Sequence, residues 1–184
     1  MTARATRKRQ PDEPPDASGA MEIAIRFLGA RPRTRWELDR RLRRGGVGAL
    51  DIGATLARLA KMGYVDDAAF ARWWGEQRDR HAARGRRMIE AELRQHGIER
   101  DVIQAYREVH IEPERAPEDE DLPGTEEDRA DEALMRHLRG RSLPDEGKAR
   151  QRIGMFLVRR GFDPETVRGA IRRAGSLTDE DEGR

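Results

Sequence analysis

A short signature that recurs along the chain constrains its fold more than any other feature. In each copy, a leucine stands four residues before a glycine, an apolar residue follows the glycine at once, and another lies six positions beyond it. A helix that ends on a left-handed glycine, with the next apolar side chain folded back on its last turn, requires these residue types at this spacing. Copies about fifty and sixty residues apart predict tandem helical repeats. The leucine and glycine pairs are Leu42 and Gly46, Leu93 and Gly97, and Leu157 and Gly161.

The apolar spacing around each signature predicts three short helices per repeat. In the first repeat, Thr34 and Glu37 have the spacing of a capping box. In the third, Asp163 and Pro164 form a cap followed by a proline at the first helical position. Only 36% of the residues are hydrophobic and 39% are charged, which suits thin cores better than one thick core. We therefore predict an all-α protein of three tandem three-helix repeats, forming an elongated, curved stack.

The segments outside the repeats lack periodic apolar residues. Eleven acidic residues between Glu112 and Glu132 indicate a linker, and prolines without helical spacing indicate a disordered N-terminal arm. Because the linker is long, we do not expect the second and third repeats to be held in a fixed mutual orientation. The expected segments are a disordered arm at 1–19, repeat 1 at 20–64, repeat 2 at 65–110, an acidic linker at 111–130, repeat 3 at 131–175 and an acidic tail at 176–184.

Several classes of protein are disfavoured by what the sequence lacks. The chain has no cysteine, which excludes disulfides and thiolate metal sites, and its four histidines are not closely spaced. We expect no metal or cofactor. No apolar run approaches the roughly 18 residues of a membrane span, and no signal peptide is evident, so a cytoplasmic protein without membrane contact is expected. Phosphate-binding loops, dinucleotide fingerprints and cysteine nucleophiles are absent, so an enzyme is the class least favoured.

Charge is segregated along the chain. Residues 21–111 and 133–178 hold thirty basic and seventeen acidic residues, and all but three of the chain's basic residues are arginine. Arginine favours bidentate contact with phosphate or carboxylate, which indicates an anionic partner, although a compositional preference for arginine over lysine is an alternative cause. The acidic linker is interpreted either as a solubilising connection or as a phosphate mimic that shields the arginines until a stronger anion competes.

Clustered arginines near the helix ends are the candidate partner-binding residues. Solvated helix faces explain part of such clustering, but its recurrence in each repeat favours a continuous anion-binding surface, formed mainly by the second and third repeats. The candidates are Arg40, Arg43, Arg44, Arg78, Arg84, Arg86, Arg87, Arg94, Arg159, Arg160, Arg172 and Arg173.

Two other groups of residues have a structural and a functional interpretation. Asp66 and Asp67 are adjacent carboxylates, but their side chains diverge once a helix begins, so helix capping is favoured over metal binding. Phe70, Trp73 and Trp74 have helical spacing, which favours core packing. Stacking of one tryptophan on nucleic-acid bases is the alternative.

Four runs of sequence resemble the RecX family and occur in the order typical of that family. The resemblance spans roughly residues 20–175, and its most specific part is Gly-Tyr-Val-Asp-Asp at 63–67 followed by Phe70. The chain departs from the family pattern in its acidic linker and at His96, where a basic residue is common. The four runs are Glu37 to Leu42, Leu59 to Ala71, Gly85 to Ile98 and Phe156 to Phe162.

The resemblance implies a non-enzymatic regulator that binds the RecA recombinase filament on single-stranded DNA. Such a protein inhibits the ATPase, strand-exchange and co-protease activities of RecA and promotes filament disassembly. We expect a monomer that also contacts single-stranded or double-stranded DNA through its arginines. Two alternatives stay open: a general arginine-rich, helical nucleic-acid-binding protein that acts without recombinase, and a helical scaffold for an unrelated acidic protein.

Overall fold

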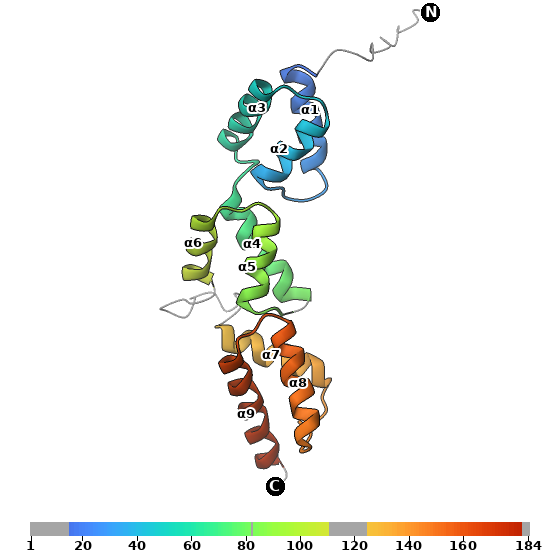
Figure 1. Ribbon diagram of the computed structural model, residues 1–184, viewed down its shortest axis with the longest axis vertical. Helices are drawn as coiled ribbons and strands as arrows, with labels where there is room; N and C mark the ends of the chain where they lie inside the picture. The colour runs from blue at the N-terminus through green and yellow to red at the C-terminus, as the bar shows by residue number, and fades with distance from the viewer. Residues whose placement is uncertain (1–14, 82, 111–124, 182–184) are drawn as a thin grey trace, which may run out of the picture. The chain divides into compact units, whose positions relative to one another are not determined.

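The computed structural model describes residues 15–81, 83–110 and 125–181, and all regular structure within these ranges is α-helical. The predicted all-α class is confirmed, and each helix packs against the other two of its own repeat (Figure 1). No helix in these ranges is long and apolar enough to cross a membrane. The helices are α1 (Ala17–Leu28), α2 (Arg35–Arg44), α3 (Ala49–Lys61), α4 (Asp67–His81), α5 (Arg86–Gln95), α6 (Arg100–His110), α7 (Glu126–Leu138), α8 (Gly147–Arg159) and α9 (Pro164–Asp181).

The chain divides into two compact units, Met1–Asp66 and Asp67–Arg184. The first unit holds α1 to α3, and the second holds α4 to α9. Each repeat nevertheless has its own thin core of buried apolar side chains, as the composition predicts. The largest contributions come from Leu38, Leu42, Ile52, Leu56 and Leu59 in the first repeat, Phe70, Ile89, Leu93, Ile103 and Tyr106 in the second, and Leu134, Leu138, Leu157, Phe162 and Val167 in the third.

The glycine signature forms the same helix end in all three repeats. The backbone φ is +78° at Gly46, +76° at Gly97 and +92° at Gly161. In chain order, the amide after each glycine donates a hydrogen bond of 3.2, 3.1 or 3.3 Å to the carbonyl of the signature leucine. These leucines and the apolar residues after the glycines are buried. The predicted C-terminal motif is confirmed, and it closes each core by returning the chain onto the last helical turn.

The predicted helix starts are also confirmed. The Thr34 amide donates to Glu37 Oε2 at 3.2 Å, and the Glu37 amide donates back to Thr34 Oγ1 at 3.1 Å. Asp163 Oδ1 accepts hydrogen bonds from the first amides of α9, which begins at Pro164. Asp66 and Asp67 lie at the start of α4, where the capping interpretation places them. Among the residues that the structure describes, no cluster of histidine, aspartate and glutamate suits a metal ion.

The helices extend past three of the expected segment bounds. Helix α1 begins at Ala17, inside the arm expected to be disordered, because Asp16 Oδ1 accepts a 2.9 Å hydrogen bond from the Gly19 amide. Helix α7 begins at Glu126, inside the expected linker, because Thr125 and Asp128 form a capping box. Helix α9 continues to Asp181, inside the expected tail. The rest of the arm, the linker and the tail lies outside the described residues.

The expectation that the second and third repeats are not held in a fixed orientation is wrong. Both belong to one compact unit, in which the Gly85 amide donates to the Arg160 carbonyl at 2.9 Å. A Cβ added to Gly85 would overlap the backbone of Gly161, and a Cβ on Gly161 would lie 2.5 Å from the Met88 amide nitrogen. Ala83, which precedes α5, is fully buried in the core of the third repeat. This direct approach of two backbones, the glycine junction, requires glycine on both sides.

Glu126 caps helix α5 from across the glycine junction. The N-cap of α5 is Gly85, which has no side chain to accept a hydrogen bond. The Arg86 amide donates instead to both carboxylate oxygens of Glu126, at 3.0 and 3.2 Å. A residue that must be glycine for steric reasons therefore receives its capping acceptor from α7. Burial raises the pKa of Glu126, and the hydrogen bond from the Arg86 amide offsets this only in part.

Substitution of Glu126 tests this cap. We expect Glu126→Ala to lower the free energy of unfolding of the second unit by about 1 kcal/mol, the usual loss for a helix cap. Glu126→Gln keeps an acceptor and removes a charge whose burial is unfavourable, so it should be at least as stable as the parent at pH 7. That advantage should shrink as the pH falls through the raised pKa of Glu126, since protonation removes the same charge from the parent. Urea unfolding of parent and variants at neutral and acidic pH measures both effects; a destabilised glutamine variant would contradict the sign.

Candidate partner-binding surfaces

Three of the predicted partner-binding arginines are paired with carboxylates on the protein itself. Arg43 Nε lies 2.6 Å from Asp39, and Arg94 Nη2 lies 2.8 Å from Glu90, each within one helix. Arg173 forms a bidentate contact with Asp131, with both distances at 2.8 Å. An arginine whose charge is already matched gains less from an anionic partner, because it must exchange one carboxylate for another.

Two further candidates, Arg78 and Arg84, hold the second repeat together. Both bind the carboxylate of Glu92, which is 9% exposed: Arg78 Nε donates to Oε2 at 2.6 Å, and Arg84 Nη1 donates to Oε1. Trp74 Nε1 also donates to Glu92, at 2.8 Å, and the Arg78 guanidinium lies 4.1 Å from the centre of the Trp74 ring. This cluster joins α4 to α5. Its half-buried tryptophan packs against Phe70 and His96, as the core interpretation of the aromatic residues expects.

Arg86 and Arg160 lie at the glycine junction. The amide of Arg86 is the group that Glu126 caps. Arg160 Nη1 donates to the Ala83 carbonyl at 3.2 Å, and its guanidinium lies 4.7 Å from the centre of the Phe156 ring. Burial lowers the pKa of Arg160, with further lowering by nearby arginines. Both arginines therefore lie where the second and third repeats meet, and both are only partly exposed.

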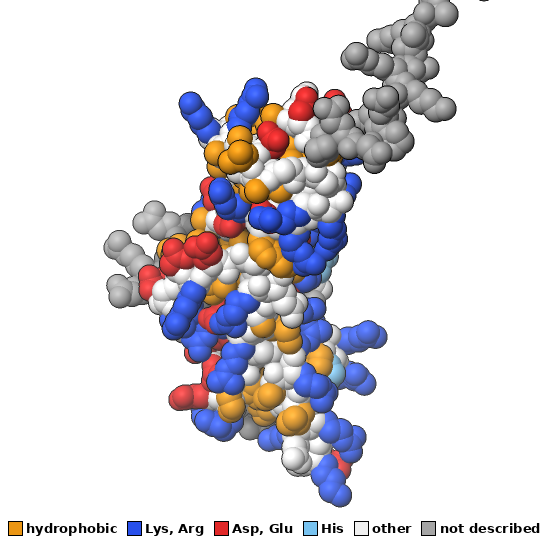
Figure 2. All heavy atoms as spheres, turned by 45° about the horizontal axis from the view of Figure 1, so that its top comes forward, with side chains coloured by type: hydrophobic (Ala, Val, Ile, Leu, Met, Phe, Trp, Pro, Cys, Tyr) orange, Lys and Arg blue, Asp and Glu red, His pale blue; other side chains and the backbone are white. Residues whose placement is uncertain are grey.

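The remaining candidates are exposed. None of them forms an ion pair with a carboxylate of the described residues. Figure 2 shows lysine and arginine side chains over much of the visible surface, with apolar side chains between them. The structure adds exposed cations that are not among these candidates, although Lys148 and Arg152 flank Arg150 in a basic run of the sequence: Lys148, Arg152 and Arg168. The exposed candidates are Arg40, Arg44, Arg87, Arg159 and Arg172.

In the first unit, two of these arginines share a helix face with a tryptophan. Trp36 is 41% exposed, and the Arg40 guanidinium lies 4.4 Å from the centre of its ring. Arg44 follows one turn later on the same face of α2, opposite the buried Leu38 and Leu42. Tryptophan and arginine dominate the binding energy of protein interfaces more than other residues do. This set, Trp36, Arg40 and Arg44, is named the Trp36 face. In the sequence, the spacing of four residues between Trp36, Arg40 and Arg44 indicates this shared face. Trp36 lies within the Thr34 capping box, which favours a purely structural interpretation of the segment.

In the third repeat, a second exposed face combines cations with apolar side chains. Lys148, Arg152, Met155 and Arg159 line a shallow depression of about 550 Å³ along α8. Met155 is 48% exposed, and the adjacent Val158 is 40% exposed. An exposed apolar centre with a basic rim is typical of a surface that contacts an acidic protein. These five residues are named the α8 face.

Comparison with known proteins identifies the family. Residues 20–59 match the family model described as "RecX, first three-helix domain", and residues 66–106 match "RecX, second three-helix domain". The "Regulatory protein RecX" of Mycobacterium avium (strain 104) is 36% identical to this chain over 151 residues, covering 82% of this chain and 81% of the relative. The chain belongs to the RecX family. The RecX of Thermobifida fusca (strain YX) is 38% identical, with 82% of this chain and 80% of the relative covered.

Solved RecX structures share the fold. The crystal structure of RecX from Lactobacillus salivarius has a TM-score of 0.70 and 16% identity, and the comparison covers 88% of this chain and 97% of that one. A second RecX crystal structure has a TM-score of 0.64 and 18% identity, covering 84% and 70% of the two chains. The third repeat lies outside both matched family segments, but it carries the glycine signature of the other two.

The sequence run most specific to RecX has a structural role. The backbone φ of Gly63 is +76°, and the Tyr64 amide donates to the Leu59 carbonyl at 3.0 Å, so the run ends α3 with the same left-handed turn. Val65 is then buried in the core of the first repeat. Phe70, on α4, is buried in the core of the second repeat. The motif therefore closes one three-helix module and starts the next.

Proposed function

We propose that this RecX-family protein binds the RecA recombinase filament on single-stranded DNA and restrains its ATP hydrolysis, strand exchange and co-protease activity. The observation that carries the proposal is membership of the family over four fifths of the chain, with relatives named as regulatory proteins. The protein acts by binding, as a regulator without catalysis of its own. Its exposed cations and apolar side chains supply contact surfaces for an acidic protein partner.

The direct test is ATP hydrolysis by the cognate recombinase, preassembled on single-stranded DNA and titrated with this protein at fixed salt. Binding of the protein to the same DNA without recombinase is measured in parallel. Inhibition at concentrations far below those that coat the DNA supports a filament-directed regulator. Inhibition that only follows DNA coating, or no inhibition, contradicts the proposal and favours a general nucleic-acid-binding protein.

Within this function, we assign the Trp36 face to the recombinase contact. Replacing both Trp36 and Arg40 by alanine is expected to raise the concentration needed for half inhibition at least tenfold, since a tryptophan with a stacked arginine matches the usual interface hot spot. Their side chains make no contribution to the buried core of the first unit, so helicity should be unchanged. The measurement is the same ATPase titration.

Leu50→Ala is the matched control for this variant. Leu50 is 91% exposed in the same unit, so its truncation removes exposed apolar surface without touching the Trp36 face. The control should inhibit as the parent does. Equal inhibition by the Trp36 and Arg40 variant would remove this face from the contact surface and leave the α8 face as the next candidate.

A further inference from the structure

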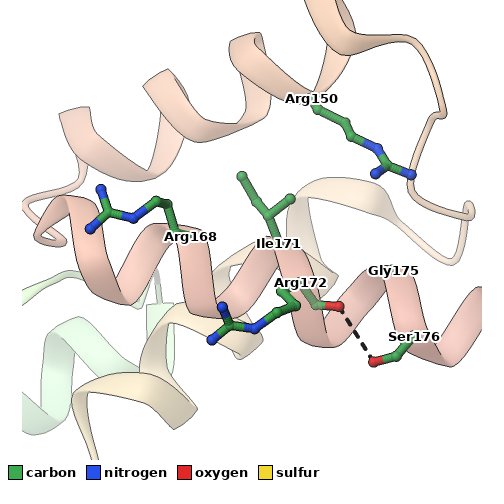
Figure 3. A pocket seen from close by; sticks show the side chains of 6 residues that line it. All are labelled: Arg150, Arg168, Ile171, Arg172, Gly175 and Ser176. Carbon is green, nitrogen blue, oxygen red and sulfur yellow. Dashed lines mark hydrogen bonds between the residues drawn. The ribbon is translucent and has the colours of Figure 1, made fainter.

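A groove between α8 and α9 is lined by arginines from both helices. It is an open groove with a volume of about 530 Å³, bordered by Arg150, Arg168, Ile171, Arg172, Gly175 and Ser176 (Figure 3). Arg168 and Arg172 lie one helical turn apart on α9, and Arg150 comes from α8 across the groove. Ile171 points from α9 toward α8 and is the apolar residue among those that border the groove. Only Arg172 of these residues belongs to the arginine clusters evident in the sequence.

The α9 wall of the groove carries two exposed arginines. Arg168 and Arg172 are exposed, and neither is paired with a carboxylate of the described residues. Arg150 is held in place, since its Nε donates to the Pro144 carbonyl at 2.7 Å and its Nη2 lies 3.1 Å from Asp145. The Ser176 hydroxyl bonds to backbone carbonyls of α9, at 2.9 Å for Arg173 and 3.4 Å for Arg172. Among the residues that the structure describes, the groove thus offers two guanidinium groups without a carboxylate partner beside one fixed one.

We propose that this groove binds the phosphodiester backbone of single-stranded DNA, with neighbouring phosphates at Arg168 and Arg172. Residues one helical turn apart have Cβ atoms about 5–6 Å from each other, a separation that an extended strand can match with successive phosphates. Arginine presents a planar fork of donors that fits phosphate oxygens. Arg150 borders the opposite side of the strand, and Ser176 is the polar residue at the end of the groove. The site makes contact with DNA a property of the protein itself, separate from its contact with recombinase.

The chemistry of the groove favours nucleic acid over an acidic protein. Protein interfaces depend on apolar or aromatic anchors in a desolvated centre, and among the described residues that border the groove the only large apolar side chain is the half-buried Ile171. The α8 face differs in this respect, because its cations surround exposed Met155 and Val158. Phosphate contact needs cations and polar groups without such anchors. The third repeat therefore offers two basic surfaces of different kinds.

The test is binding of the full-length protein to a fluorescein-labelled oligodeoxythymidylate, measured by anisotropy over a series of salt concentrations without recombinase. Each phosphate contact on single strands contributes about 0.7 to the slope of log affinity against log salt. Replacing both Arg168 and Arg172 by alanine should therefore lower that slope by about 1.4 and weaken binding on the order of tenfold at about 0.1 M salt.

The control variant carries Arg58→Ala and Arg72→Ala. These arginines are also exposed, they lie outside the groove, and their loss changes the net charge by the same amount. The control should keep the parent slope. Equal losses in both variants would mean that only overall charge matters, and an unchanged slope in the groove variant, or no binding by the parent, would overturn the site. A groove variant that binds DNA normally but fails to inhibit recombinase would assign the groove to a protein partner instead.

Discussion

Alanine at Gly161 is expected to lower the free energy of unfolding of the second unit by about 3 kcal/mol or more. Two penalties coincide at this position. The backbone φ of +92° is unfavourable for any residue with a Cβ, at roughly 1–2 kcal/mol. The new Cβ would also lie 2.5 Å from the Met88 amide nitrogen and 2.6 Å from the Met88 Cβ, and overpacking of this kind costs about 1–3 kcal/mol. Because backbone lies on both sides, no rotamer change relieves the contact.

Gly140→Ala separates the two penalties. Gly140 belongs to the same unit and has a similar left-handed backbone, with φ +76°, but no atom lies within 4 Å of an added Cβ. Its replacement should therefore show the backbone penalty alone. Urea unfolding followed by the fluorescence of Trp73 and Trp74, in a Trp36→Phe background, reports on the second unit. If Gly161→Ala is no more destabilising than Gly140→Ala, this result contradicts the close contact between the two backbones at the glycine junction.

The features that could be predicted from the sequence are those that depend on neighbouring residues. The left-handed glycines and the Thr34 capping box are fixed by residues within one or two helical turns, so spacing alone locates them. The start of α7 is not among the predicted helix starts, although Thr125 and Asp128 have the same capping spacing. The acidic residues around this motif are typical of a linker, so composition and local capping favour different structures at this position.

The glycine junction could not be predicted, because its two glycines are far apart in the chain. Gly85 looks like an ordinary helix start, and only the backbone of Gly161 explains why no larger residue occupies it. The arginines present the same problem. The sequence shows the charge of Arg78 and Arg84, but not that both are bound to a buried glutamate on the next helix. Whether a cation serves the fold or a partner depends on tertiary contacts that spacing does not encode.

Replacing Asp79 by alanine is expected to produce a loss as large as that at Gly161, or larger. Asp79 on α4 accepts hydrogen bonds from Arg129 on α7, with 3.2 Å between Arg129 Nε and Asp79 Oδ1. The Arg129 side chain is only 1% exposed, so removal of Asp79 takes a hydrogen-bonded carboxylate away from a guanidinium that water barely reaches, while Glu126 remains as a nearby acidic group. Breaking a buried pair on one side typically costs about 3–5 kcal/mol. Urea unfolding of the variant measures the loss.

Removing both charges should restore most of the stability. Burial raises the pKa of Asp79, and the attraction of Arg129 offsets the effect of burial only in part. The ionised carboxylate is therefore less stable in the folded protein than in water. For this reason, a protein with a well-packed apolar pair at these two positions should be nearly as stable as the protein with the ion pair. We expect the free energy of unfolding of the variant with both Asp79→Leu and Arg129→Met to lie within about 1 kcal/mol of that of the parent. Each single variant should be much less stable than the parent.

The pH dependence of this cycle provides an independent check. The penalty for burying ionised Asp79 is present above its raised pKa and disappears once both the folded and the unfolded protein are protonated. The stability of the double variant relative to the parent should therefore be highest near pH 7 and should decrease as the pH falls. A double variant that stays as unstable as Asp79→Ala at neutral pH would show that the ion pair itself stabilises the contact between the second and third repeats. In that case the ion pair would be the main contact that holds α4 against α7. The glycine junction would contribute less.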